Sequence, residues 1–172
     1  MFTHNSIGGL LPIRLILPVA ALVIGVAMAG PSRAGGTVVN VSLWDKGTSM
    51  EQATDLGFPA DSKDMSKASM GIALSVDTVK AGETTFEVLN SSKETIHEMI
   101  VVRLKDPKKA LPYDSGASTV DEERAGHLGE VSELEPGKTG ALRLDLKPGN
   151  YLLFCNIAGH FMAGMWTSFT VK

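Results

Sequence analysis

Cysteine and clustered positive charge are both scarce in this sequence of 172 residues. The single cysteine, Cys155, cannot form a disulfide within the chain. Beyond residue 34, fourteen Lys and Arg stand against nineteen Asp and Glu, a net charge of −5, without a basic cluster or a basic stripe interleaved with aromatic residues. Nucleic acid is therefore not expected as a partner. Helical periodicity is weak as well, so most of the order must come from strands.

Residues 1–34 contain no acidic residue, one early cation, Arg14, and an apolar run over residues 15–29. This is typical of a secretory signal peptide of the Sec type. Cleavage patterns of small residues end at Ala29 and at Ala34, and we favour Ala34. An uncleaved membrane anchor facing the periplasm is the alternative, but fifteen helical residues rise only about 22 Å, against ~30 Å of hydrocarbon core. We predict a periplasmic or otherwise exported protein whose mature chain has no membrane span.

The remaining residues, 35–172, suit a single domain. Its β-rich runs recur between turn signals such as Ala81-Gly82 and Pro148-Gly149, which is an all-β pattern. We expect strands over residues 37–44, 71–79, 84–89, 96–104, 140–146, 151–154 and 166–171. A two-sheet β-sandwich of Greek-key type is the economical fold. Two polar stretches, residues 46–70 and 105–131, are predicted to be surface insertions with short helices.

One short loop between two apolar segments carries three metal donors: Cys155, His160 and Met165 follow each other at intervals of five residues. Exported chains rarely keep a free thiol without a use. A buried small hydrophobe is the alternative interpretation of Cys155, but it does not explain the other two donors. Thiolate, imidazole and thioether together select copper, and two His and one Cys with a weak axial Met form the blue-copper electron-transfer site.

One imidazole is missing from that set. Metal–ligand bonds near ~2 Å require the donors to converge within roughly 4 Å, so the fourth ligand must come from a neighbouring segment. His97 is the best candidate, because a strand there would hold it beside the strand that ends at Cys155. We therefore predict one type 1 copper ion, cycling between Cu(II) and Cu(I), held by His97, Cys155, His160 and Met165.

This pattern resembles the cupredoxin family: a strand, Cys, four residues, His, four residues, Met, a last strand, and an upstream His on another strand. The resemblance covers roughly residues 71–172, and the loop is similar to those of rusticyanin-like and sulfocyanin-like members. It implies a sandwich of the eight-strand type with copper at one end, ligated by the four residues named above. One departure is Glu98, because many cupredoxins have Asn or Ser after the upstream His, and an acidic group there can lower the potential or change the copper–sulfur geometry.

Other residues are weaker candidates for metal binding. Met162 competes with Met165 as the thioether ligand, although a second Met more often fills a gap in the core. Packing is also favoured over an accessory Cu(I) site for Met50, Met65, Met70 and Met99. His127, with Glu123 four residues earlier if residues 120–127 are helical, offers a second ion site, but a solvated polar face is favoured.

Counting ligands excludes several enzymes. A trinuclear oxidase cluster needs more than the three histidines beyond residue 34, and a dinuclear thiolate-bridged centre needs two cysteines. A Cys and His nucleophile pair would not require Met165 at this spacing. We therefore expect a monomeric electron carrier rather than an enzyme, with a transient redox partner such as a cytochrome or oxidase that docks on the apolar residues flanking His160. The alternative is a periplasmic protein for copper storage, delivery or tolerance.

Overall fold

The computed structural model describes residue 1 and residues 36–47, 52–61 and 63–172. Its contacts divide the chain into two units, Met1–Arg33 and Ala34–Lys172. The expected signal peptide, apart from Met1, and Met50 lie outside the described residues. No helix in the described ranges combines the length and the apolar character that crossing a membrane requires. All the strands described below belong to the second unit.

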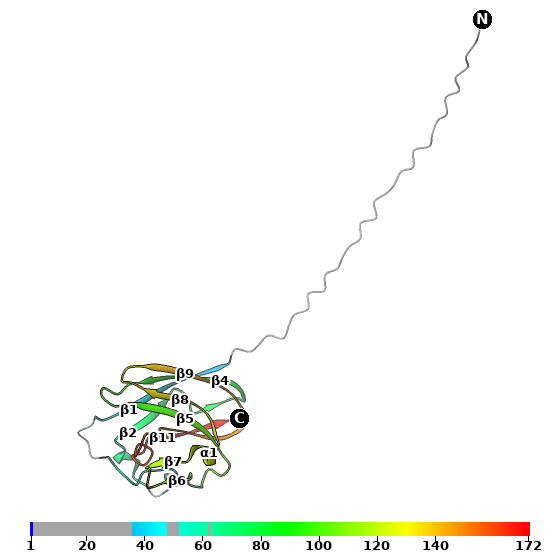
Figure 1. Ribbon diagram of the computed structural model, residues 1–172. Coiled ribbons are helices and arrows are strands. Elements are labelled where there is room, and N and C mark those ends of the chain that lie inside the picture. Colours follow the sequence, from blue (N-terminus) through cyan, green and yellow to red (C-terminus); the bar gives the residue numbers. More distant parts are fainter. Residues whose placement is uncertain (2–35, 48–51, 62) are drawn as a thin grey trace. The chain divides into compact units, whose positions relative to one another are not determined.

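Two mixed sheets make up the fold (Figure 1). The first has the order β2-β1-β4-β9 and the second β3-β11-β10-β5-β8. The first sheet contains β1 (Thr37–Asp45), β2 (Met70–Leu74), β4 (Gly82–Asn90) and β9 (Thr139–Leu146). The second contains β3 (Thr78–Val79), β5 (His97–Leu104), β8 (His127–Leu134), β10 (Gly149–Phe154) and β11 (Trp166–Val171). The prediction of an all-β, two-sheet sandwich is confirmed.

Short elements complete the described part. A small hairpin pairs β6 (Tyr113–Asp114) with β7 (Thr119–Val120), and the helices are η1 (Met65–Lys67) and α1 (Glu122–Ala125). Helix α1 begins after Asp121, whose side chain accepts from the Arg124 amide, and ends at Gly126 with a φ of +83°. These are an N-cap and a left-handed C-cap, which together limit the helix to a single turn.

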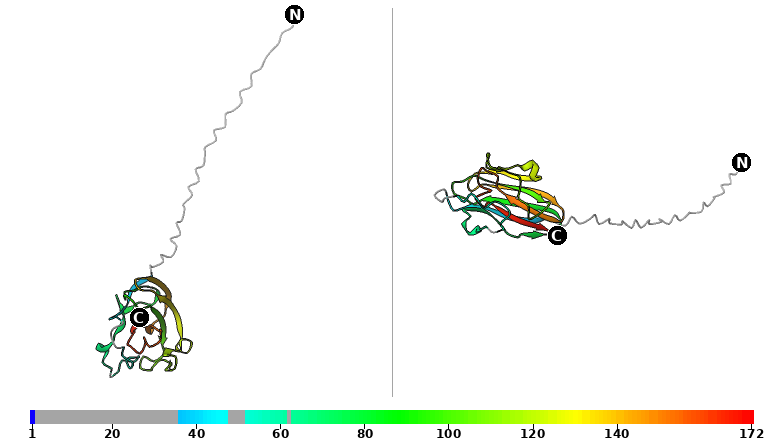
Figure 2. Two further views of the ribbon diagram at one scale, coloured as in Figure 1. Left: turned by 60° about the vertical axis from the view of Figure 1, so that its left-hand side comes forward. Right: turned by 90° about the horizontal axis from the view of Figure 1, so that it is seen from below.

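The two sheets bury one core between them, and the strands lie in two layers when seen from below (Figure 2). Alternate residues of β5 and β10, including Met99, Val101, Tyr151 and Leu153, point into this core. The residues between them belong to a second cluster, which also contains Phe58 and Val120 from the two insertions. These two strands are buried on both faces, and this explains why they read as unbroken apolar runs.

The structure differs from the predicted strands in the run 71–79, in β8 and in the small hairpin of β6 and β7, which was not predicted. The run 71–79 is split into β2 and β3, which belong to different sheets. Strand β8 lies largely inside the stretch 105–131 that was predicted to be a surface insertion. Val131 is its one buried residue, because β8 is the edge of the second sheet and much of it is solvated. An edge strand of this kind lacks the apolar alternation that identifies strands in a sequence.

Phe86 of β4 and Phe169 of β11 join the two layers. Their ring centroids lie 5.3 Å apart in an edge-to-face arrangement, and both side chains are buried. We expect Phe86→Ala to lower the free energy of unfolding by about 3–5 kcal/mol, since it removes a fully buried ring and leaves a cavity. Leu89→Ala, on the exposed face of the same strand, should cost less than about 1 kcal/mol. Urea unfolding measures both, and equal losses would contradict this assignment of the core.

Candidate metal centre

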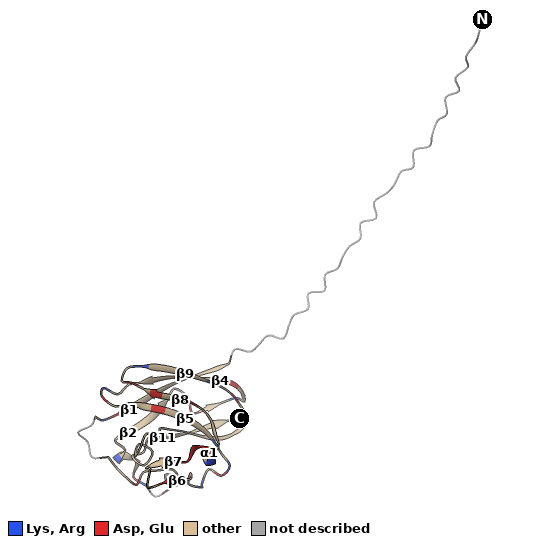
Figure 3. Cartoon of the chain, viewed as in Figure 1, with Lys and Arg blue, Asp and Glu red and all other residues tan. Residues whose placement is uncertain are grey.

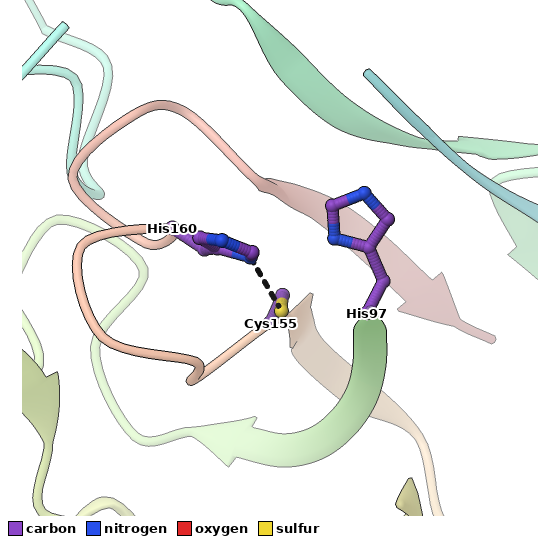
Figure 4. A group of neighbouring side chains, drawn as sticks. All are labelled: His97, Cys155 and His160. Atoms are coloured by element: carbon purple, nitrogen blue, oxygen red, sulfur yellow. Dashed lines mark hydrogen bonds between the residues drawn. The ribbon is translucent and has the colours of Figure 1, made fainter. Parts of the chain in front are cut away.

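Three of the four predicted ligands meet at one end of the sandwich. His97 is the first residue of β5, Cys155 follows β10 directly, and His160 lies in the loop between β10 and β11. One donor atom from each of the three lies within 4.8 Å of the others, and all three residues are buried. Figure 4 shows the Cys155 sulfur beside the His160 ring, at an Sγ to Nδ1 distance of 3.4 Å. The His97 and His160 ring centroids are 5.1 Å apart.

The sheet register brings His97 and Cys155 together. β10 pairs with β5 in antiparallel fashion, with Phe154 opposite Ile100. Continuing this register places Cys155 opposite Met99. His97 lies two residues before Met99, so it is on the same face of β5 as the inward-facing Met99 and Val101. Both side chains therefore point into the space between the sheets, because residues two apart in a strand share a face.

Hydrogen bonds within the loop 155–165 fix its shape. The Cys155 amide donates to the Met165 carbonyl at 3.0 Å, and the Met165 amide donates to the His160 carbonyl at 3.1 Å. Gly159 and Gly164 have φ values of +85° and +95°, which non-glycine residues rarely adopt. Met165 is fully buried, and these bonds hold its backbone against both Cys155 and His160.

Segment 52–61, from the first insertion, covers this loop. The Leu56 amide donates to the Met162 carbonyl at 2.8 Å, and Trp166 Nε1 donates to the Leu56 carbonyl at 2.7 Å. The Phe58 and Trp166 rings pack edge to face, with centroids 5.2 Å apart. The insertion therefore shields the loop from water instead of being a mere surface excursion.

Burial sets the protonation of the three donors. Desolvation lowers the pKa of His97, against the opposing effect of Asp45, and desolvation together with His97 lowers the pKa of His160 to about 4. Burial also raises the pKa of the Cys155 thiol to about 12. Near neutral pH the site without metal thus presents two neutral imidazoles and a thiol. Neutral imidazoles are the form that binds metals, and a thiol that loses its proton on binding is a normal ligand.

An orphaned polar atom supports the fit to a metal. Nδ1 of His97 is buried and has no hydrogen-bond partner among the described residues. A buried polar group without a partner costs roughly 1–3 kcal/mol. Imidazole nitrogens and a cysteine sulfur that converge among buried side chains are the donor set of copper or zinc. The buried Met165, whose backbone bonds to Cys155 and His160, favours copper.

Glu98 supplies a contact that the sequence did not predict. Its Oε1 accepts a hydrogen bond at 2.9 Å from the backbone amide of Asn156, the residue directly after Cys155. Asn156 in turn binds the backbone of Val120 and donates to the Glu122 carboxylate at 2.8 Å. The carboxylate of Glu98 therefore ties β5 to the start of the loop. The one feature of the sequence that pointed to this contact is that Asn156 directly follows Cys155.

Among the weaker candidates, the sulfur of Met162 packs against Gly57. Met70 and Met99 lie in the main core, and Met65 lies in η1 near Gly164. The less favoured alternative, a pairing of His127 with Glu123 on one helix, is not found, because α1 ends at Ala125 and His127 begins β8. His127 instead groups with Glu122 and Glu130 at the surface.

The predicted apolar patch around His160 is only partly exposed. Ala158 is exposed, Ile157 and Met162 are half-buried, and Phe161 packs inward against Phe154. His160 keeps 6% of its surface accessible, whereas His97 and Cys155 have none. Of the three donor residues, His160 is therefore the one with accessible surface.

Comparisons with known proteins give a likeness of fold. No protein-family model and no curated protein matches the chain. Among solved structures, reduced auracyanin from Roseiflexus castenholzii aligns at 17% identity and a TM-score of 0.48, covering 81% of this chain and 98% of that one. Rusticyanin from Thiobacillus ferrooxidans aligns at 16% and 0.49, covering 80% and 79%. Auracyanin B aligns at 20% and 0.47, covering 79% and 88%.

The pH dependence of stability should report on Glu98. Burial, opposed by the hydrogen bond from Asn156, raises its pKa to about 7 from 4.5. The folded state therefore binds this proton more tightly, and the resulting stability, complete below pH 4.5, is lost as the pH rises through about 7. Glu98→Gln should become more stable relative to wild type by about 1–2 kcal/mol between pH 4.5 and 8, since partial exposure screens the effect.

Urea unfolding of the metal-free protein at several pH values measures this difference. Glu87→Gln, on the exposed face of β4, is the matched control and should follow the wild-type pH dependence. A Glu98→Gln curve that runs parallel to wild type across this range would show that Glu98 titrates as an ordinary surface carboxyl.

Proposed function

We propose that this protein is an exported mononuclear type 1 copper protein that carries single electrons between redox partners. The observation that supports this most strongly is the convergence of His97, Cys155 and His160 on a buried point, with the Nδ1 atom of His97 left unpartnered among the described residues. The signal-peptide pattern of residues 1–34 is the basis for proposing export. The spacing of the loop motif is the basis for proposing Met165 as the fourth ligand.

Cys155 would act as the thiolate ligand, His97 and His160 as the imidazole ligands, and Met165 as the weak thioether ligand. A bound copper ion would supply the chemistry, gaining or losing one electron between Cu(II) and Cu(I). The chain keeps its donors in one arrangement, because strand pairing holds His97 and Cys155 and loop hydrogen bonds hold His160 and Met165. Small reorganisation between the two oxidation states favours fast electron exchange.

Electrons would enter and leave through His160, the donor residue with accessible surface. The neighbouring Ala158, Ile157 and Met162 offer a small, partly apolar rim on which a redox partner could dock transiently. Carrier function would require contact at His160 only, and segment 52–61 covers other parts of the loop.

Burial also favours an electron carrier over a copper-delivery protein. Delivery by ligand exchange needs a thiolate that an acceptor can reach. Cys155 and His97 are fully buried, and the thiol has a strongly raised pKa. Copper should therefore stay bound while electrons exchange.

Adding one equivalent of Cu(II) to the purified protein tests the proposal. We expect an intense visible thiolate-to-copper band and narrow parallel hyperfine splitting in the electron paramagnetic resonance spectrum. Cys155→Ser should abolish the band, because it removes the charge-transfer donor. A colourless wild-type protein, or an unchanged band in Cys155→Ser, would refute the ligand assignment.

The two loop methionines allow a matched comparison. Met165→Leu should retain copper but raise the reduction potential, since loss of the thioether destabilises Cu(II) relative to Cu(I). Met162→Leu should leave the potential unchanged, because its sulfur packs against Gly57. Redox titration of both variants decides the matter, and a shift confined to Met162→Leu would reverse the assignment of the thioether ligand.

Retention of the reduced metal separates the two functions. The Cu(I) protein should keep its metal against a moderate Cu(I) chelator over the time in which it completes many cycles of electron exchange. Rapid loss of Cu(I) to the chelator, with slow electron exchange, would favour copper handling instead.

A further inference from the structure

Asp45 lies against the proposed copper centre from the opposite sheet. It is the last residue of β1 in the first sheet, whereas His97 begins β5 in the second. Its Oδ2 is 3.1 Å from Nε2 of His97, with side-chain exposures of 7% and 0%. Among the described residues, this is the only contact of this kind between a carboxylate and a buried histidine. Nothing in the local sequence of either residue predicts it.

The carboxylate of Asp45 is itself held in place. Its Oδ1 accepts from the Gly47 amide at 2.7 Å, which closes a tight turn at the end of β1. Its other oxygen, Oδ2, faces Nε2 of His97. Both oxygens of Asp45 therefore lie against nitrogen atoms, where a carboxylate acts as an acceptor.

This chemistry fixes the tautomer of His97. An ionised carboxylate can only accept, so the proton of the neutral imidazole resides on Nε2. The lone pair is then on Nδ1, the buried nitrogen that has no partner in the described part of the chain. A simple structural ion pair with a doubly protonated His97 would leave a buried N–H at Nδ1 without an acceptor.

We propose that Asp45 is a positioning residue for the copper centre, which fixes the His97 ring and its tautomer so that Nδ1 faces Cys155 and His160, and which strengthens His97 as a ligand. This inference rests on the proposed function. A carboxylate that accepts from a ligand imidazole increases the basicity of that ligand and commonly affects metal affinity 10- to 100-fold. A more basic imidazole favours Cu(II), so Asp45 lowers the reduction potential.

Nitrogen-15 NMR of the metal-free protein tests the tautomer without copper. We expect His97 to be neutral with the proton on Nε2 at pH 7. A proton on Nδ1, or a doubly protonated ring, would overturn the inference. This measurement uses the wild-type protein and is independent of whether any variant folds.

Asp45→Asn tests the carboxylate charge with almost no change in shape. The amide presents both a carbonyl and an NH₂ group to Nε2, so it no longer imposes one tautomer. We expect Cu(II) affinity to fall by about 10-fold, and by up to about 100-fold in Asp45→Ala. A 10-fold loss of Cu(II) relative to Cu(I) affinity raises the potential by about 59 mV.

Asp77→Asn is the matched control, because it also removes one negative charge. It is an exposed residue whose carbonyl accepts from Thr170, near the far end of β11 from the loop 155–165. Affinity and potential should match wild type in this variant. Equal values in Asp45→Asn and Asp77→Asn, with a normal copper band in wild type, would overturn the role of Asp45 and leave the proposed function standing. No copper band in wild type would overturn both.

Discussion

The antiparallel pairing of β5 with β10 is the constraint on which the site depends. It places His97 and Cys155 at the same end of the second sheet and on its inward face. A slip of one residue would send one of the two side chains to the opposite face, because side chains alternate along a strand. The core residues Met99, Val101, Tyr151 and Leu153 oppose such a slip, since it would move the inward side chains of one strand out of the main core and into the second apolar cluster, which other side chains already fill. The apolar core therefore fixes the geometry of the polar site.

Removal from water decides the chemistry of the three donors. Burial keeps both imidazoles neutral and the thiol protonated. The charged groups contact the donors or their neighbours and are not themselves donors. Asp45 contacts His97 from one side, and Glu98 contacts the Asn156 amide from the other. Acidic positions on β5 and β8 lie beside each other (Figure 3). The charges of Glu122, Glu130 and Glu133 raise the pKa of Glu98 further. Negative charge thus surrounds the site without occupying it.

The two insertions cover the loop 155–165 and the outer face of the second sheet. The first places Leu56 and Phe58 on the loop 155–165, and the second places Val120 beside Asn156 on the outer face of the second sheet. A sandwich normally leaves such a face to solvent, but here β5 and β10 are enclosed on both sides. This enclosure stiffens the strands that carry His97 and Cys155, and it leaves His160 as the accessible residue of the three donors.

The sequence by itself determined the all-β class and the candidate ligands His97, Cys155, His160 and Met165, because strand alternation, turn residues and donor spacing are local properties of the chain. It did not reveal β8, whose polar edge-strand composition resembles a loop. Only the tertiary structure identified Asp45, which lies 52 residues from His97 along the chain, and the contact of Glu98 with Asn156 at a separation of 58 residues. Such contacts form where two sheets or two paired strands meet. Neither segment therefore shows a periodic pattern of residues from which the contact could be predicted. The protonation of the donors was likewise decided by burial, which is a property of the packed fold.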